Sequence, residues 1–242
     1  GIALLEESLA LAMKVGHDEH AARVYTNLAE YGVDYKNFEL AERVISDGIA
    51  FDTQHDLDSW THYLVGRLAQ LRMEQGRLRD AETIATGVLK LDRLTLLMKL
   101  PALIVLARVR IRLGEPDAHE LADKALQDAL ATDESQYLVP ALFNLIELAW
   151  LEDKPNSAAE HLQRLTNIGA QQMHTWNIGE AAVWAQRIGL TLPPDFDIQL
   201  PGPCAEELAG NYEQAAESWE ALGAPYSAAL CLMQGEKQLV AP

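Results

Sequence analysis

Histidine and acidic side chains cluster at one place where their spacing could bind a metal ion. His17 and His20 lie three residues apart in the sequence HDEH, beside Asp18 and Glu19. Two histidines at this spacing share one side of a helix, and neutral imidazole is a common zinc ligand. A zinc site needs further ligands, and none is indicated nearby. We therefore interpret the motif as a solvated turn between two helices.

The other groups that could do chemistry lack the arrangement that catalysis needs. The remaining histidines are scattered, with no nucleophile in range of any motif. The pairs Glu6-Glu7 and Glu206-Glu207 sit on adjacent positions, which point about 100° apart on a helix, so we interpret them as solvated faces and not as acid/base dyads. The sequence thus predicts no catalytic residue, no metal and no cofactor. Five tryptophans at helical positions are better explained by packing between helices than by a ligand cage: Trp60, Trp150, Trp176, Trp184 and Trp219.

Composition limits the class of protein and its partners. Among 242 residues, 36 are acidic and 19 are basic, and the net charge of −17 would repel a nucleic-acid backbone. Alanine and leucine dominate while β-branched runs are scarce, which favours an all-α protein. No apolar run approaches the ~18 residues of a membrane span. Cys204 and Cys231 have no CxxC spacing, so we expect neither a zinc site nor a disulfide framework, and a cytoplasmic setting.

Residues 60–92 read as two amphipathic helices joined by a tight turn. Apolar residues recur at helical spacing on both sides of the sequence QGR, and Gly76 can adopt the left-handed conformation that ends a helix. Ala69 and Ala81, twelve residues apart, are small where two antiparallel helices would cross. We expect a helical hairpin that cannot bury its apolar face alone.

The same hairpin pattern recurs along the chain. After a first helix over residues 2–15, we place complete hairpins at residues 20–52, 60–92, 99–132 and 136–168. In the third hairpin His119 occupies the place of the small residue, which suggests a one-residue shift around Pro116. A period of 38 to 40 residues with two helices per unit predicts an all-α fold, an α-α superhelix or solenoid. The small residues spaced by twelve resemble the tetratricopeptide pattern, which implies a tetratricopeptide-like solenoid, although this period is longer than the usual ~34 residues. The period is measured between first-helix residues that face the second helix: Ala29, Ala69, Ala107 and Ile146.

We expect one helical-repeat domain over residues 1–242, with regular hairpins in residues 1–168 and a less regular part in residues 169–242. The four prolines within residues 190–203 predict a loop or extended connection, because proline lacks the amide hydrogen that a helix interior needs. Helical pattern resumes at Cys204. The chain starts at Gly1 in what reads as a helix, without an initiator methionine, so we expect a fragment of a longer protein.

Several short motifs carry a resemblance to a known family. They are YTNL at 25–28, EQGR at 74–77, PALIVL at 101–106, LAGNY at 208–212, WEALG at 219–223 and PYSAAL at 225–230. Over almost the entire chain the sequence resembles the tetratricopeptide-like helical-repeat region of large LuxR-type bacterial transcriptional regulators. In that family an ATP-binding module or a cyclase domain precedes the repeats and a helix-turn-helix domain commonly follows. This chain contains no GxxxxGK[ST] motif and no basic recognition helix after Tyr226. The resemblance implies a sensor or interaction segment and transfers no catalytic residue.

The first helices of a solenoid line its concave face, where a ligand would bind. Residues of the first helices that flank the small packing residue are therefore candidate binding residues, although inter-unit core is an equally good explanation for several of them. The candidates are Tyr63, Gln70, Met73, Arg108, Arg112, Phe143 and Glu147.

Arginines in the third hairpin add a charge argument to this surface. Arg108 and Arg112 fall on one side of a helix while Arg110 points away, and two guanidinium groups one turn apart suit a carboxylate or a phosphate. The alternative is that acidic side chains of the next unit, such as Glu147, already neutralise them.

Two functions remain open from the sequence. The chain is either a non-enzymatic module that binds a protein, a peptide or a small inducer within a regulator, or a stand-alone adaptor that holds an extended peptide in its groove. Under both, we expect no direct binding of nucleic acid and no membrane association, and the open ends of the solenoid offer surfaces for self-association.

Overall fold

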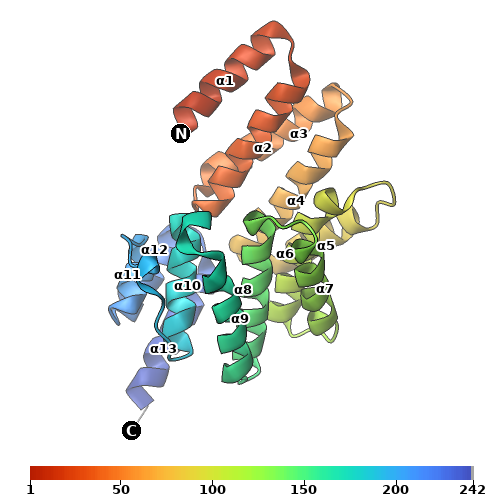
Figure 1. Cartoon of the computed structure of the whole chain (residues 1–242). Coiled ribbons are helices and arrows are strands. Elements are labelled where there is room, and N and C mark those ends of the chain that lie inside the picture. Colours follow the sequence, from red (N-terminus) through yellow and green to blue (C-terminus); the bar gives the residue numbers. More distant parts are fainter. Residues whose placement is uncertain (241–242) are drawn as a thin grey trace. The chain divides into compact units, whose positions relative to one another are not determined.

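Helices make up almost all of the protein in the computed structural model, which describes residues 1–240 and the side chains of residues 1–236 (Figure 1). Helix accounts for 79% of the chain, and no strand occurs in the described range. Helices that follow one another in sequence pack against one another, as the consecutive pairs α2 with α3 and α8 with α9 illustrate. The predicted all-α class and the α-α solenoid arrangement are confirmed.

The chain divides into two compact units. The first comprises Gly1–Met73 and Arg77–Val109, and the second comprises Glu74–Gly76 and the chain from residue 110 onward. The first unit holds α1 (Ile2–Val15), α2 (Asp18–Asp34), α3 (Phe38–Gln54), nearly all of α4 (Asp58–Glu74), α5 (Leu78–Leu89) and most of α6 (Leu96–Leu113).

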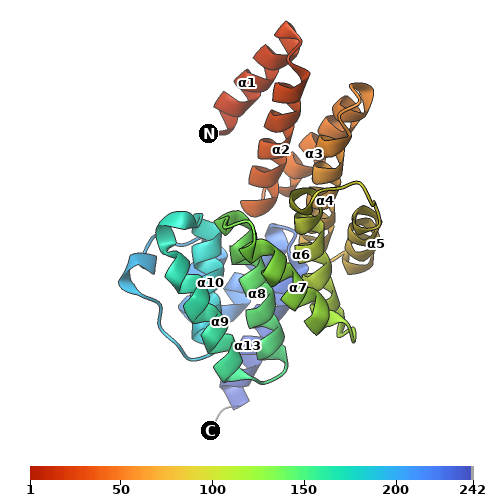
Figure 2. The ribbon, with the colours of Figure 1, turned by 45° about the vertical axis from the view of Figure 1, so that its right-hand side comes forward.

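The second unit holds the end of α6 and seven further α-helices of the described residues. These are α7 (Ala118–Leu130), α8 (Ser135–Leu151), α9 (Pro155–Ile168), α10 (Thr175–Arg187), α11 (Gly202–Leu208), α12 (Tyr212–Ala221) and α13 (Pro225–Val240), with short 3-10 helices η1 (Ala170–Gln172) and η2 (Pro194–Phe196). Figures 1 and 2 both show α8, α9 and α10 side by side, and these three helices contact one another.

Residues in the left-handed conformation end the helices at nearly regular intervals. Gly16, Lys36, Asp56 and Gly76 follow one another every twenty residues, all with positive φ between 56° and 74°. Gly114, Asp133 and Asp153 continue the series. A left-handed residue turns the chain back at the end of a helix, so that the next amide can bond a carbonyl of the last turn, as Leu57 does to Asp52 and Arg77 does to Arg72. Two such steps of twenty residues produce the period near forty that the sequence indicates.

The crossing of α2 and α3 shows why the packing residues are small. Ala29 and Ala41 are both fully buried, and a Cβ added at Gly32 would lie 2.9 Å from the backbone nitrogen of Ala41. A distance this short leaves no room for a side chain, so glycine and alanine allow the two backbones to approach. The small pair that the sequence identifies therefore marks a real helix contact.

The third hairpin confirms the expected one-residue shift. Ala118 is buried, whereas His119 is exposed and its Nε2 lies 2.6 Å from Glu152. The amide of Ala118 bonds the carbonyl of Glu115, so the first turn of this segment is tighter than an α-helical turn. The tighter turn moves the small residue one position toward the amino terminus.

The proline-rich segment is more structured than the sequence predicts. Residues 190–203 include the 3-10 helix η2 and the first two residues of α11, Gly202 and Pro203, so the expectation of a connection without helix is wrong at these positions. Proline is compatible with the first turn of a helix, where the backbone amide has no intrahelical partner in any case. Pro203 lies in the first turn of α11 in this way, and Pro194 begins η2.

Helix α8 lies in the interior of the second unit. Every residue from Ala141 to Ala149 is buried, which is expected of a helix that is apolar on all sides and surrounded by other helices. Two polar residues interrupt this apolar run, Asn144 and Glu147, with exposed fractions of 0% and 1%. A buried carboxylate in such a helix needs a cation or hydrogen-bond donors beside it.

Candidate interaction site

Glu147 of α8 is bound by an arginine of α6. The Nε of Arg112 donates a hydrogen bond to Oε1 of Glu147 at 2.9 Å, and Nη2 donates to Oε2 at 3.3 Å. The two side chains expose only 8% and 1% of their surface. A two-point contact of this kind fixes the orientation of both groups, because the planar guanidinium matches the two carboxylate oxygens.

The beginning of α13 completes this site from far along the chain. The hydroxyl of Tyr226 donates to Oε1 of Glu147 at 2.7 Å, and the Cζ of Arg112 lies 3.9 Å from the centre of the Tyr226 ring. The guanidinium therefore makes a cation–π contact with the ring while it holds the carboxylate. Pro225 lies against the turn after α4, where a Cβ at Gly76 would come within 2.7 Å of its Cγ. Pro225 and Tyr226 thus each meet a matching surface within the second unit.

Charge within this cluster is balanced by neighbours. Burial alone would lower the pKa of the Arg112 guanidinium, but the carboxylates of Glu147 and Glu74 and the nearby Tyr226 outweigh burial and raise that pKa. Arg112 therefore stays charged. The sequence alternative in which Glu147 neutralises the arginine is confirmed for Arg112. Arg110 lies 3.5 Å from Asp117, so it too has an acidic neighbour.

A second polar cluster joins α2 and α4 in the first unit. Arg67 donates to Glu30 at 2.6 Å, to the Tyr63 hydroxyl at 3.0 Å and to the side-chain oxygen of Gln70 at 2.7 Å. The amide of Gln70 in turn donates to Asp34 at 3.1 Å. Burial opposes the charge on Arg67, but its acidic and phenolic neighbours outweigh burial and raise the pKa of the guanidinium. The network connects the first helices of two successive repeats.

A third cluster corrects the interpretation of Glu206-Glu207 as a solvated pair. Glu207 is only 1% exposed, and its Oε1 accepts a hydrogen bond from Arg187 at 2.9 Å. The thiol of Cys231 donates to Oε2 at 2.9 Å. Adjacent helical residues point in different directions, so one member of such a pair can enter the core while the other does not. Burial and the bond to Glu207 raise the pKa of the Cys231 thiol, which remains protonated and unreactive.

Four of the seven candidate residues lie in the interior. Met73, Arg108, Phe143 and Glu147 are between 1% and 6% exposed. The structure therefore corrects the prediction that they line an open surface. The apolar first helices are buried on several sides, so residues beside the small packing position face neighbouring helices as well as any groove. This is the inter-unit core that the sequence offered as the alternative.

The other three candidates belong to the two polar clusters already described. Tyr63 and Gln70 are half-buried and both bond Arg67, while Arg112 bonds Glu147. The structure thus brings together Tyr63 with Gln70 in the first unit, and Arg112 with Glu147 in the second.

The histidines of the HDEH motif lie at a helix start. His17 directly precedes α2, and the Nε2 of His20 lies 3.3 Å from the hydroxyl of Ser8 on α1. Among the side chains that the structure describes, no group of three or more His, Cys, Asp or Glu residues is arranged to hold a metal ion. The motif therefore contributes to the contact between two neighbouring helices.

The tryptophans pack against each other, as the sequence predicts. The rings of Trp150 and Trp184 have centroids 5.6 Å apart, and so do the rings of Trp176 and Trp219. Trp184 and Trp219 are buried. Both pairs join different helices, so the packing interpretation is confirmed for these four residues.

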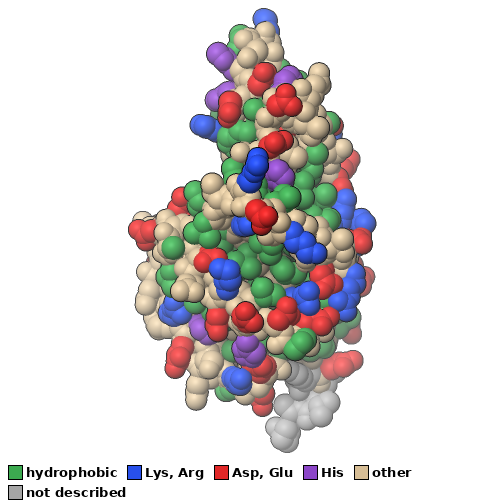
Figure 3. Space-filling view, turned by 90° about the vertical axis from the view of Figure 1, so that its right-hand side faces the viewer, with side chains coloured by type: hydrophobic (Ala, Val, Ile, Leu, Met, Phe, Trp, Pro, Cys, Tyr) green, Lys and Arg blue, Asp and Glu red, His purple; other side chains and the backbone are tan. Residues whose placement is uncertain are grey.

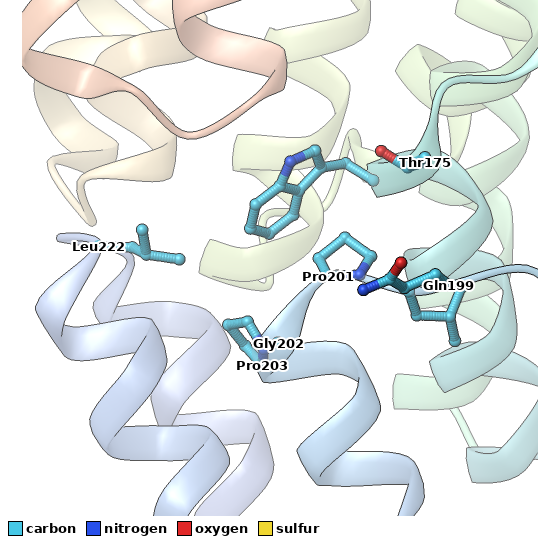
Figure 4. Close-up of a pocket in the computed structure, with 8 residues that line it drawn as sticks. Thr175, Gln199, Pro201, Gly202, Pro203 and Leu222 are labelled. Atoms are coloured by element: carbon cyan, nitrogen blue, oxygen red, sulfur yellow. The ribbon is translucent and has the colours of Figure 1, made fainter.

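A shallow hollow of about 390 Å³ lies beside the proline-rich segment (Figure 4). In the figure, Leu222 and Gln199 lie on opposite sides of it. Apolar groups dominate its wall, and Thr175 and Gln199 are its polar side chains. Since no charged residue lines it, the hollow offers apolar contact without a group that would fix a ligand's orientation. Its lining residues are Thr175, Trp176, Gln199, Leu200, Pro201, Gly202, Pro203 and Leu222.

The surface carries both signs of charge. On the face shown in Figure 3, acidic and basic side chains are interspersed, with hydrophobic side chains exposed between them. Within the described part of the chain, no helix is long and apolar enough to span a membrane.

Sequence reasoning missed several participants in the clusters, among them Arg67, Arg187 and Tyr226. For Glu147 a signal existed, because an acidic residue within the continuous apolar run of α8 predicts a buried ion pair. For Tyr226 no local signal exists, since 79 residues separate it from Glu147.

Comparison with known proteins leaves the family open. The chain matches no family model, no curated protein and no solved structure.

Proposed function

We propose that this chain is a non-enzymatic helical-repeat module that binds a protein or peptide and serves as the sensing segment of a LuxR-type bacterial regulator in the cytoplasm. The observation that carries the interaction role is the cluster of Arg112, Glu147 and Tyr226. There, side chains of two first helices hold a tyrosine from a distant segment through a ring contact and a hydrogen bond. A surface that holds one segment of polypeptide in this way has the chemistry to hold another.

The regulator role rests on the resemblance of the sequence motifs to that family. The α-solenoid fold is compatible with it, because such folds present extended surfaces for partners. In this proposal, a protein or peptide is the favoured ligand and a small inducer is the alternative. The charge of −17 disfavours direct contact with nucleic acid by this chain, so DNA binding is assigned to another domain of the regulator.

The gene that encodes the chain provides the test. A phosphate-binding loop encoded upstream, or a helix-turn-helix domain encoded downstream in the same reading frame, supports the regulator. A reading frame with neither domain supports the second candidate, a stand-alone tetratricopeptide-like adaptor that binds an extended peptide. The cluster of Arg112, Glu147 and Tyr226 supports that candidate as well, because a stand-alone adaptor also needs side chains that can hold a segment of polypeptide.

A further inference from the structure

The first two residues of α13 contact other parts of the second unit. Tyr226 is half-buried between Arg112 and Glu147, and Pro225 lies against Gly76 with its other side exposed. We infer that this site recognises a Pro-Tyr dipeptide in a partner protein, and that Pro225 and Tyr226 occupy it as an internal competitor until the partner displaces them. The inference rests on the proposed interaction function and adds to it the kind of segment that is bound and the way in which binding is controlled.

The proline half of the site depends on Gly76. Gly76 adopts φ +74°, which residues with a side chain rarely do, and its missing Cβ leaves the space that the Pro225 ring fills. A side chain at this position would meet Pro225 at 2.7 Å. A rigid proline fits such a flat backbone surface with little loss of conformational entropy.

The tyrosine half of the site contacts both the ring and the hydroxyl of the tyrosine. The Arg112 guanidinium lies 3.9 Å from the ring centre, and Glu147 accepts the hydroxyl at 2.7 Å. Arg112 and Glu147 already hold each other by two hydrogen bonds, so neither has to reorient when a tyrosine enters. A site that bonds a hydroxyl discriminates against the analogue that lacks it, so phenylalanine is a poor substitute.

The internal occupant can leave without exposing an unpaired buried charge. If Tyr226 departs, Glu147 keeps its two bonds from Arg112, which avoids the large penalty of an isolated carboxylate. Tyr226 is half-buried and lies in the first turn of α13, a helix that packs along α12. Release therefore requires movement of the start of one helix and leaves the ion pair intact.

The test uses the full chain and a peptide of its own sequence. In the Tyr226→Ala variant the tyrosine half is vacant while Pro225 stays beside Gly76, so this variant tests the tyrosine half. The probe is a peptide of residues 223–230, GAPYSAAL, with both ends blocked. We expect calorimetry to show binding of this peptide to the variant and at least about tenfold weaker binding to the parent chain, where Tyr226 competes. The same peptide with phenylalanine in place of tyrosine should bind the variant about tenfold more weakly.

Three results would overturn the inference: equal peptide affinity of parent and variant, no binding by a variant that keeps its helical circular dichroism, or equal affinity of the two peptides. If Tyr226→Ala does not fold, Tyr226→Phe replaces it. Tyr212→Phe is the matched control, because the Tyr212 hydroxyl has no hydrogen-bond partner among the residues that the structure describes. Amide exchange in the first turns of α13 should then rise in Tyr226→Phe alone. Equal exchange in both variants also overturns the inference.

The peptide-binding test and the reading-frame test of the proposed function can succeed or fail independently of each other. Peptide binding by Tyr226→Ala, combined with a reading frame that lacks a DNA-binding domain, keeps this inference and removes the regulator. A DNA-binding domain without peptide binding does the reverse.

Discussion

Buried carboxylates in the two units have opposite surroundings. In the first unit, Asp52 of α3 is 0% exposed, and neither of its carboxylate oxygens has a hydrogen-bond partner among the described residues. In the second unit, Glu207 of α11 is 1% exposed, but Arg187 and Cys231 bond its two oxygens. Equal burial therefore does not mean equal stability, because the partner decides whether a buried charge is tolerated.

The pKa of Asp52 reflects this difference. Burial raises the pKa of its carboxyl group from 3.8 to about 6, and His55 lowers it less than burial raises it. The nearby Glu19 carboxylate raises it further. At neutral pH the fold must hold an ionised Asp52 carboxylate to which no described residue donates a hydrogen bond, whereas the Glu207 carboxylate accepts from a guanidinium and a thiol. We therefore expect substitutions at Asp52 and at the partner of Glu207 to change the free energy of unfolding by different amounts.

The largest effect is expected where a pair is broken inside the core. Arg187→Gln would leave Glu207 buried without its cation, and we expect the free energy of unfolding to fall by about 3–5 kcal/mol. Urea unfolding followed by circular dichroism measures this loss. Arg164→Gln is the matched control, because it removes the same charge from an exposed position on α9.

A double substitution sharpens this test. Replacing both Arg187 and Glu207 with apolar residues of similar volume should recover most of the lost stability, since no buried charge remains. A loss for Arg187→Gln no greater than that for Arg164→Gln would mean that solvent reaches Glu207 and that the pair is not important for the fold.

The next largest effect is a gain in the free energy of unfolding, and it is expected when Asp52 loses its charge. Because the folded state holds the Asp52 proton more tightly than the unfolded chain, the stability from protonated Asp52 is complete below about pH 4 and is lost as the pH rises to about 6. This loss amounts to about 2–3 kcal/mol at neutral pH. Asp52→Asn removes it, and after the cost of an unpaired amide we expect a gain of about 1–2 kcal/mol at pH 7.

The pH dependence distinguishes this cause from others. The gain for Asp52→Asn should shrink as the pH falls and disappear below about pH 3, where the parent carboxyl is protonated in both states. Asp47→Asn, an exposed position on the same helix, removes the same charge and should show no such change. Equal gains for the two variants at pH 7 would assign the effect to the net charge of the acidic chain and not to burial of Asp52.

The helices and their contacts could be predicted because their signals are local. Gly76 ends α4 in the left-handed conformation, and the small residues Ala69 and Ala81 are both fully buried, as their spacing indicates. The repeat makes each such signal recur, so that an irregular position such as His119 is recognised against the others. These features depend on residues at most a few turns apart.

The clusters could be predicted only in part because their members come from distant elements. The sequence named Glu147 as a neighbour of the arginines, but it gave no reason to place Tyr226 beside them. The prediction from proline content was also wrong at one point, since Pro203 lies in the first turn of a helix where the composition indicated a loop. In both cases the outcome depends on which other surface the residue meets, and a single sequence does not contain that information.

The smallest effect is expected for an ion pair at the surface. Lys124 and Asp128 of α7 lie 2.9 Å apart, the same distance as the buried pair of Arg112 and Glu147, but their side chains expose 58% and 18% of their surface. Water stabilises both ions in the unfolded chain almost as well, and the order of lysine before aspartate on a helix is the weaker one. We expect Lys124→Gln to change the free energy of unfolding by less than about 0.5 kcal/mol, and by less still in about 0.5 M salt. A loss above about 1.5 kcal/mol in urea unfolding would show that distance, and not burial, sets the strength of these pairs, and the contrast between Asp52 and Glu207 would then need another explanation.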